Sequence, residues 1–378
     1  MKKVLLFILL FSAASFAQKD AYYDSTVVNG IRQIYNLKFP AAEATFRKLI
    51  AVYPEEPAGR FFLAMVDWWK ILLDLDDESH DDIFYQKVED VIYFCDKILD
   101  KNPNDVDALF FKGGAIGFRG RLRATRESWI KAADDGREAL PIVEHASKLD
   151  PNNLDVQLGF GIYNYYASVI PEKYPMVKPL MLFFPSGNKA KGLEQLNNTA
   201  MNGKYAKYEA RYFLMTLYYQ FENNPYKADE YAKMLVSDFP DNSHFERWRG
   251  RIAVRRGDYY FASDIFNDVF SKYQKKMTGY DKKAAREAKY YIAVHQRNMS
   301  KLDTARVLFE EELQLCREVD KKEESGFQIN AVLYLGMLND MLGKRDEAVK
   351  YYKMLLNMKE YGESRNKAKA YLQNPYKE

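Results

Sequence analysis

The chain has 378 residues, of which 47% are hydrophobic and 15% aromatic, and its formal net charge is +3. A charge so close to zero leaves no electrostatic footprint for nucleic acid or for an anionic membrane surface. Cys95 and Cys316 are the only cysteines, so no dense disulfide framework supports the fold, and a helical chain of this length can bury enough apolar surface without one.

Residues 1–17 have the features of a secretory signal peptide. Two lysines precede the apolar run 4–11, and Ser15 and Ala17 place small residues before the expected cleavage site. This run is shorter than the about 20 apolar residues that cross a membrane, and no later run approaches that length. No cysteine follows the leader to accept a lipid. We therefore expect a mature chain that starts at Gln18, is periplasmic or secreted, and has no transmembrane segment.

In the N-terminal part of the chain, several expected helices end at a proline with the same spacing. In residues 42–54, an alanine, a phenylalanine, a leucine and a proline are separated by four, three and five positions. Similar spacings lead to Pro103, Pro151 and Pro240, and each of these prolines precedes acidic or amide residues. Because proline stops a helix and short polar side chains cap the next one, the pattern predicts helix pairs joined by short turns.

Residues 168–190 form a predicted proline-rich insert. Four prolines in this stretch exclude a regular helix through most of it, and they surround the apolar residues 180–184. An apolar segment of this kind must be covered. We expect the insert to dock on its own solenoid, with Phe183 and Phe184 against aromatic residues. A partner or a membrane surface is the alternative cover.

The C-terminal part repeats a second pattern at constant phase. A small residue lets two helices approach, a glycine or serine seven positions later makes the turn, and an alanine and an aromatic residue pack the second helix on the first. The three sets are Gly250, Gly257, Ala262 and Phe266; Ala293, Ser300, Ala305 and Phe309; and Gly336, Gly343, Ala348 and Tyr352. Further upstream, Gly113 and Gly120 are assigned to the same small and turn positions.

This in-phase series resembles the tetratricopeptide repeat family. The resemblance implies an all-α, right-handed superhelical solenoid of about eight helix-turn-helix repeats, with a concave inner face. The tryptophan that the family has early in the first helix is missing from most repeats. The repeats are expected to begin near residues 23, 57, 106, 154, 209, 243, 286 and 329, with a capping helix at 364–371.

Sequence motifs for catalysis are not found. The four histidines show no two-histidine metal spacing, and there is neither a phosphate-binding loop nor a nucleophile elbow. The acidic stretch 74–82 lacks the glycine of a calcium loop and is interpreted as a solvated connection. We therefore expect no enzymatic activity, no cofactor and no metal site. An enzyme whose site is built from distant repeats is the remaining alternative.

By the same resemblance, fixed positions of each first helix line the concave wall. In the second, fourth and fifth repeats these positions hold aromatic residues that are candidate partner contacts. They include Trp68, Trp69, Tyr165, Tyr166 and Phe213.

In the sixth repeat the wall positions hold Arg247, Arg251 and Arg255. A spacing of four stacks these side chains on one helix face. Like charges at this spacing repel by about 0.2 to 0.5 kcal/mol per pair unless acidic groups form ion pairs with them. Two interpretations follow: the arginines bind a carboxylate or phosphate of a partner, or they pair within the chain with Glu287 or Asp340.

Together these features predict a non-catalytic scaffold that binds a protein or peptide partner, with acidic groups on that partner, in its concave groove. No nucleic-acid partner is expected. The alternative is a carrier of an apolar or glycan-like small ligand, held in an aromatic groove with the insert 168–190 as its lid.

Overall fold

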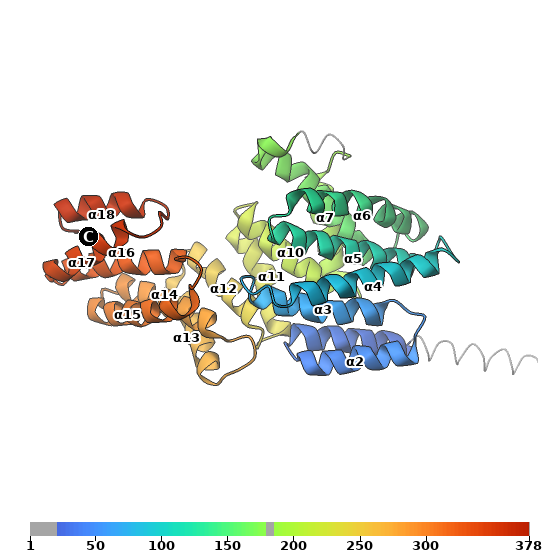
Figure 1. Cartoon of the computed structure of the whole chain (residues 1–378), viewed down its shortest axis with the longest axis horizontal. Helices are drawn as coiled ribbons and strands as arrows, with labels where there is room; N and C mark the ends of the chain where they lie inside the picture. Colours follow the sequence, from blue (N-terminus) through green and yellow to red (C-terminus); the bar gives the residue numbers. More distant parts are fainter. Residues whose placement is uncertain (1–20, 179–184, 378) are drawn as a thin grey trace, which may run out of the picture. The chain divides into compact units, whose positions relative to one another are not determined.

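The computed structural model describes residues 21–178 and 185–377, and over these ranges it consists of helices without a β-strand (Figure 1). It divides into two compact parts, residues 1–222 and 223–378, called here the N-terminal and C-terminal modules. The expected signal peptide 1–17 and the residues Phe183 and Phe184 lie outside the described residues. None of the described helices is both long and apolar enough to cross a membrane.

The N-terminal module begins with a helix over residues 21–35, and consecutive helices pack on one another from α2 to α10. The elements are α2 (Phe39–Val52), α3 (Ala58–Leu73), α4 (Asp81–Leu99), α5 (Val106–Thr125), α6 (Trp129–Leu149), α7 (Val156–Lys173), the 3-10 turn η1 (Pro175–Val177), α9 (Lys189–Asn202) and α10 (Lys207–Gln220).

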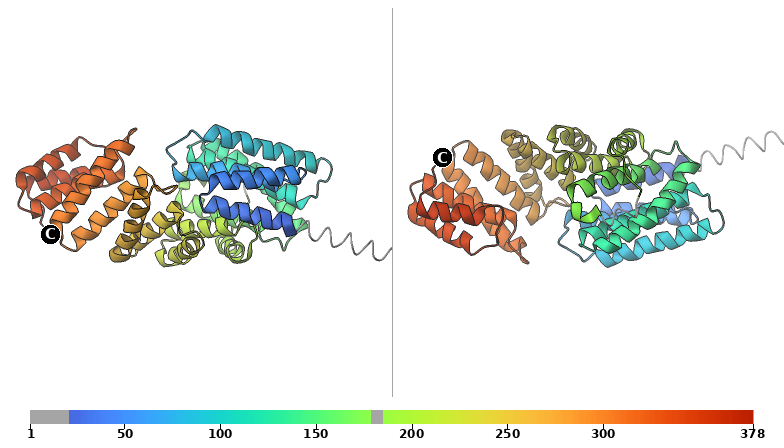
Figure 2. Two further views of the ribbon diagram at one scale, coloured as in Figure 1. Left: turned by 90° about the horizontal axis from the view of Figure 1, so that it is seen from below. Right: turned by 90° about the horizontal axis from the view of Figure 1, so that it is seen from above.

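The C-terminal module has the same arrangement of consecutive, packed helices, which Figure 2 shows in sequence order from yellow to red. Its helices are α11 (Pro225–Asp238), α12 (Ser243–Arg255), α13 (Tyr259–Gln274), α14 (Lys282–Asn298), α15 (Leu302–Val319), α16 (Gly326–Met341), α17 (Arg345–Leu356) and α18 (Ser364–Gln373). The last helix, α18, packs on α16 and α17.

Within a repeat, the two helices meet where a small residue faces an aromatic ring sixteen positions later. The pairs are Gly30 with Phe46, Gly250 with Phe266, and Gly336 with Tyr352, and a Cβ atom added to these glycines would lie 2.3, 2.6 and 2.4 Å from a ring atom. A side chain at these positions would therefore separate the helices. This contact confirms the predicted solenoid of tetratricopeptide-type repeats.

The turns between the paired helices also follow the predicted phase. Gly257, Ser300 and Gly343 have φ angles of 78°, 55° and 71°, in the left-handed region that glycine adopts most easily. Each lies seven positions after the small residue of its repeat, so one left-handed residue ends the first helix.

The assignment of Gly120 to a turn is wrong. This residue lies inside α5, which continues to Thr125, and the left-handed residue is Glu127 with φ 59°. An added Cβ atom at Gly120 would lie 3.0 Å from the Cβ atom of Asp135 on α6. Asp135 also accepts hydrogen bonds from Arg119 on α5. Gly120 therefore allows α6 to approach α5, and the turn moves one heptad further along the chain.

The end of the C-terminal module is tied together by a buried carboxylate. The side chain of Asp340 on α16 is 0% exposed. It accepts hydrogen bonds from Arg345 Nη1 at 2.9 Å, from the Tyr352 hydroxyl at 2.9 Å and from the Tyr376 backbone N–H at 2.8 Å. One side chain thus joins α16, α17 and the segment after α18.

We expect Gly336→Val to lower the free energy of unfolding of the C-terminal module by about 1 to 3 kcal/mol, because the added side chain overlaps the Tyr352 ring. Thermal unfolding followed by circular dichroism measures this change. The control is Gly117→Ala on α5, where an added Cβ atom meets nothing within 4 Å. Equal melting temperatures for the two variants would contradict the proposed contact.

Candidate functional site

The five aromatic residues predicted for the concave wall all belong to the N-terminal module, and three of them lie in its interior. Trp68, Trp69 and Tyr165 are buried, and Tyr166 and Phe213 are half-buried. In this structure the three buried rings are therefore not available to a partner. Their burial also does not favour the alternative of an aromatic groove that carries a small ligand under the insert 168–190.

An arginine on α5 fills the space between these rings. The Cζ atom of Arg121 lies 4.8 Å from the ring centre of Trp68 and 4.7 Å from that of Phe213. Its Nη1 atom donates a hydrogen bond of 2.6 Å to Glu209 on α10, which also accepts one of 3.0 Å from the Tyr35 hydroxyl. The rings and charges of this interior satisfy one another, so the module's own side chains cover Trp68, Trp69 and Tyr165.

The three arginines predicted as an anion-binding stripe do not behave alike. Arg247 Nε and Arg251 Nη2 each donate a hydrogen bond of 2.7 Å to one oxygen of Glu287 on α14, and Arg251 Nε donates to the other oxygen. Arg255 is exposed and donates from Nη2 to the side-chain oxygen of Asn223 at 2.9 Å. Glu287 therefore pairs with Arg247 and Arg251, which agrees with the interpretation that the arginines pair within the chain.

The charge of Glu287 depends on these arginines. The carboxyl group is completely buried. Burial alone would raise its pKa, but the guanidinium groups of Arg251 and Arg247 lower the pKa to about 2. Asp340, the other acid considered as a partner, binds Arg345 instead. The ion pair of Glu287 therefore holds α12 and α14 together.

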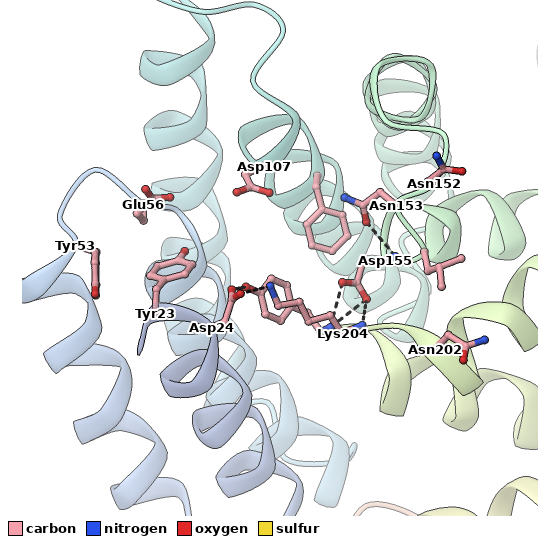
Figure 3. Close-up of a pocket in the computed structure, with 13 residues that line it drawn as sticks. Tyr23, Asp24, Tyr53, Glu56, Asp107, Asn152, Asn153, Asp155, Asn202 and Lys204 are labelled. Atoms are coloured by element: carbon pink, nitrogen blue, oxygen red, sulfur yellow. Dashed lines mark hydrogen bonds and ion pairs between the residues drawn. The ribbon is translucent and has the colours of Figure 1, made fainter. Parts of the chain in front are cut away.

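A cavity of about 570 Å³ lies at one end of the N-terminal module (Figure 3). Its lining comes from the start of the first helix, the α2–α3 connection, the start of α5 and the connections α6–α7 and α9–α10. Segments far apart in sequence thus build one concave site, which is the usual form of a binding site. None of the eight residues predicted as partner contacts lines it.

The lining of the cavity combines carboxylates with aromatic rings. Asp24, Glu56, Asp107 and Asp155 contribute four carboxyl groups, and Lys204 is the one positively charged residue among the described lining residues. Four rings stand between them, those of Tyr23, Tyr53, Phe110 and Tyr205. Figure 3 shows Glu56 and Asp107 on one side of the cavity and the paired Asp24 and Lys204 on the other.

Asp155 fixes the shape of one wall. Its Oδ1 atom accepts hydrogen bonds from the backbone N–H groups of Lys204, Tyr205 and Ala206 at 2.9, 3.0 and 2.9 Å. Burial raises the pKa of Asp155, while these three N–H groups oppose the rise. The carboxylate thus holds the connection between α9 and α10 in place. The hydroxyl of Tyr205 donates to Asp24 at 2.5 Å, which joins this connection to the first helix.

No local pattern in the sequence predicted this site. Its polar residues precede or begin helices, so Asn152 and Asn153 were interpreted as turn and capping residues alone. The hydrogen bond between Asp24 and Tyr205 spans 181 positions, and no local spacing reveals such a pairing. The available signal was the accumulation of Asp and Asn at turns that a repeat brings to the same edge of the solenoid.

We expect Glu287→Gln to lower the free energy of unfolding at pH 7 by about 2 kcal/mol, because two guanidinium groups lose their buried anion. Since the pKa of Glu287 is about 2 in the folded state and ordinarily 4.5, the wild-type advantage is complete above pH 4.5 and is lost as pH falls toward 2. Denaturant unfolding at several pH values measures both effects.

The control for this experiment is Glu347→Gln on α17, an exposed acid that pairs with Lys350. A surface ion pair contributes little to stability, so the free energy of unfolding of this variant should stay within about 0.5 kcal/mol of that of wild type. A Glu287→Gln variant as stable as this control at pH 7 would contradict the role given to the ion pair.

No family model and no curated protein matches the chain. Among solved structures, it is similar to PilW, a widely conserved type IV pilus biogenesis factor, with 17% identity over 67% of this chain and 96% of that chain and a TM-score of 0.43. It is also similar to a tetratricopeptide repeat protein from Parabacteroides merdae, with 14% identity over 79% of this chain and 96% of that chain and a TM-score of 0.39. PilF of Pseudomonas aeruginosa is similar as well, with 13% identity over 68% of this chain and 96% of that chain and a TM-score of 0.43. Within each module, the contacts between consecutive helices show the all-helical repeat fold predicted from the sequence.

Proposed function

We propose that this protein is a non-catalytic scaffold that binds a protein partner outside the cytoplasm. The observation that carries the proposal is the cavity of about 570 Å³ in the N-terminal module, whose walls come from five separate segments. A volume of this size is sufficient to take a side chain or a short loop of a partner.

The proposed location depends on the sequence of the leader. Two lysines, an apolar run and small residues before position 18 support export of the chain. Export would place the mature protein in the periplasm or outside the cell, where its partner would also be found.

The proposed contacts include the predicted residues whose side chains remain at least partly exposed. Arg255 is exposed, and Arg247, Arg251, Tyr166 and Phe213 are half-buried. Arg255 suits a partner with acidic groups, because a guanidinium group can donate two parallel hydrogen bonds to a carboxylate, whereas Arg251 already donates two hydrogen bonds to Glu287. The cavity adds a second place of contact within the N-terminal module.

A photocrosslinking amino acid at position 152, an exposed asparagine at the cavity, should capture the partner in the source cell. We expect one discrete covalent adduct, identified by mass spectrometry, because a cavity presents a defined surface to one protein. The same amino acid at the exposed position 350 on α17 is the control. Adducts of equal yield and composition from both positions, or none from position 152, would overturn the proposal for this site.

The location is tested separately. N-terminal sequencing of the native protein from an extracytoplasmic fraction should begin at Gln18. Recovery of Met1 from the cytoplasm would contradict the proposed export.

A further inference from the structure

We propose that the C-terminal module has a surface on α14 and α16 that binds an extended, tyrosine-containing segment of a partner protein, and that residues 374–377 of this chain occupy that surface as a tethered competitor. The inference adds a second contact to the proposed scaffold function, on which it rests. It depends on how one tyrosine is held, on how much of the segment is exposed, and on which contacts of the surface persist without it.

Residues 374–377 follow α18 in an extended conformation. Asn374 has φ −129° and ψ 121°, as expected for a residue that precedes a proline. Asn374, Pro375 and Lys377 are exposed, and Tyr376 is half-buried. The segment is therefore attached chiefly through Tyr376, and a segment with so little buried surface can detach from the module by a local opening.

Two consecutive repeats hold Tyr376. Arg297 Nη2 on α14 donates a hydrogen bond of 3.0 Å to its hydroxyl, and Asp340 on α16 accepts one of 2.8 Å from its backbone N–H. Arg297 and Asp340 each lie four positions after the small residue of their repeat, which is Ala293 in one and Gly336 in the other. The repeats therefore place one polar group at the phenol and one at the backbone of the same residue.

Aromatic rings complete the surface. The rings of Tyr371 and Tyr376 meet edge to face with their centres 5.1 Å apart, and the Tyr371 ring lies 5.6 Å from that of Tyr352. Tyr376 also packs against the buried hydrophobic cluster of the module. A tyrosine from another chain would find the same contacts, because Tyr371 belongs to α18 and Tyr352 to α17.

The surface keeps its own contacts when the segment leaves. Asp340 still accepts hydrogen bonds from Arg345 and from the Tyr352 hydroxyl, at 2.9 Å each. The Cζ atom of Arg297 lies 5.4 Å from the ring centre of Tyr334. A partner segment would exchange one backbone N–H and one phenol for those of Tyr376, so the bonds to Arg345 and Tyr352 stay intact. A surface that is already formed lowers the entropic cost of binding.

Attachment to α18 makes residues 374–377 a strong competitor for this surface. A short tether gives an effective concentration on the order of millimolar, so a weakly bound partner segment gains access only when Tyr376 is displaced. The hydrogen bond from Arg297 makes the surface selective for tyrosine over phenylalanine, because a phenylalanine ring offers the guanidinium group no hydroxyl oxygen in this place.

The test is saturation-transfer NMR of a capped tetrapeptide with the sequence of residues 374–377, titrated against the full-length protein. We expect saturable transfer to its tyrosine ring protons with the Tyr376→Ala variant, and an affinity about fivefold or more lower with wild type, in which the tethered segment competes. A peptide with phenylalanine in place of the tyrosine should bind Tyr376→Ala about fivefold more weakly. The tyrosine peptide should lose the same factor with Tyr376→Ala/Arg297→Met.

Tyr376→Phe removes the hydroxyl group alone and should give an intermediate affinity, which decides the question if Tyr376→Ala loses helix content in circular dichroism. The control is Tyr260→Ala on α13, which removes a tyrosine that is 70% exposed in the same module and should behave as wild type. Equal affinity of the peptide for wild type, Tyr376→Phe and Tyr376→Ala, or binding to none of them, would overturn the proposal. A negative titration together with a crosslinked partner from position 152 would remove this surface and leave the scaffold function standing.

Discussion

The buried carboxylate of Glu209 is the constraint that closes the N-terminal module. It is 7% exposed and accepts hydrogen bonds from Tyr35 on the first helix and from Arg121 on α5. A buried charge without partners is costly, and removal of one partner typically costs several kcal/mol. Because Glu209 is on α10, this helix must lie against both the first helix and α5. Helices that are 174 positions apart in the sequence are thereby held together.

Closure determines what the inner surface of this module can do. The aromatic wall predicted to contact a partner is largely a packed interior, in which Tyr35 lies 4.8 Å from Trp69 and 5.3 Å from Tyr208 between ring centres. The open space lies instead at the edge where the turns meet. Turns carry the caps and short polar side chains of the helices, so the lining of that space is polar and acidic.

The fold could be predicted from the sequence because the contact within each repeat joins two residues that are close in the sequence. Gly336 and Tyr352 lie sixteen positions apart in one helix pair, and their phase can be followed along the chain. Glu287 could be considered as a partner of the arginines for the same reason, since it lies in the next repeat. The bond between Tyr35 and Glu209 has no such local signal. The concave wall was therefore predicted as the place where a partner binds, and the cavity at its edge was not predicted.

Buried carboxylates in both modules make internal contacts from the first helices of repeats. Glu209 on α10, Glu287 on α14 and Asp340 on α16 each accept hydrogen bonds from at least two side chains. A group with such partners would have to break them to bind a second protein, which costs the hydrogen bonds it already has. The polar and charged residues at the turns line the cavity instead. In this solenoid the inner positions therefore contribute chiefly to stability, and the charged residues that line the cavity lie at the edge of the N-terminal module.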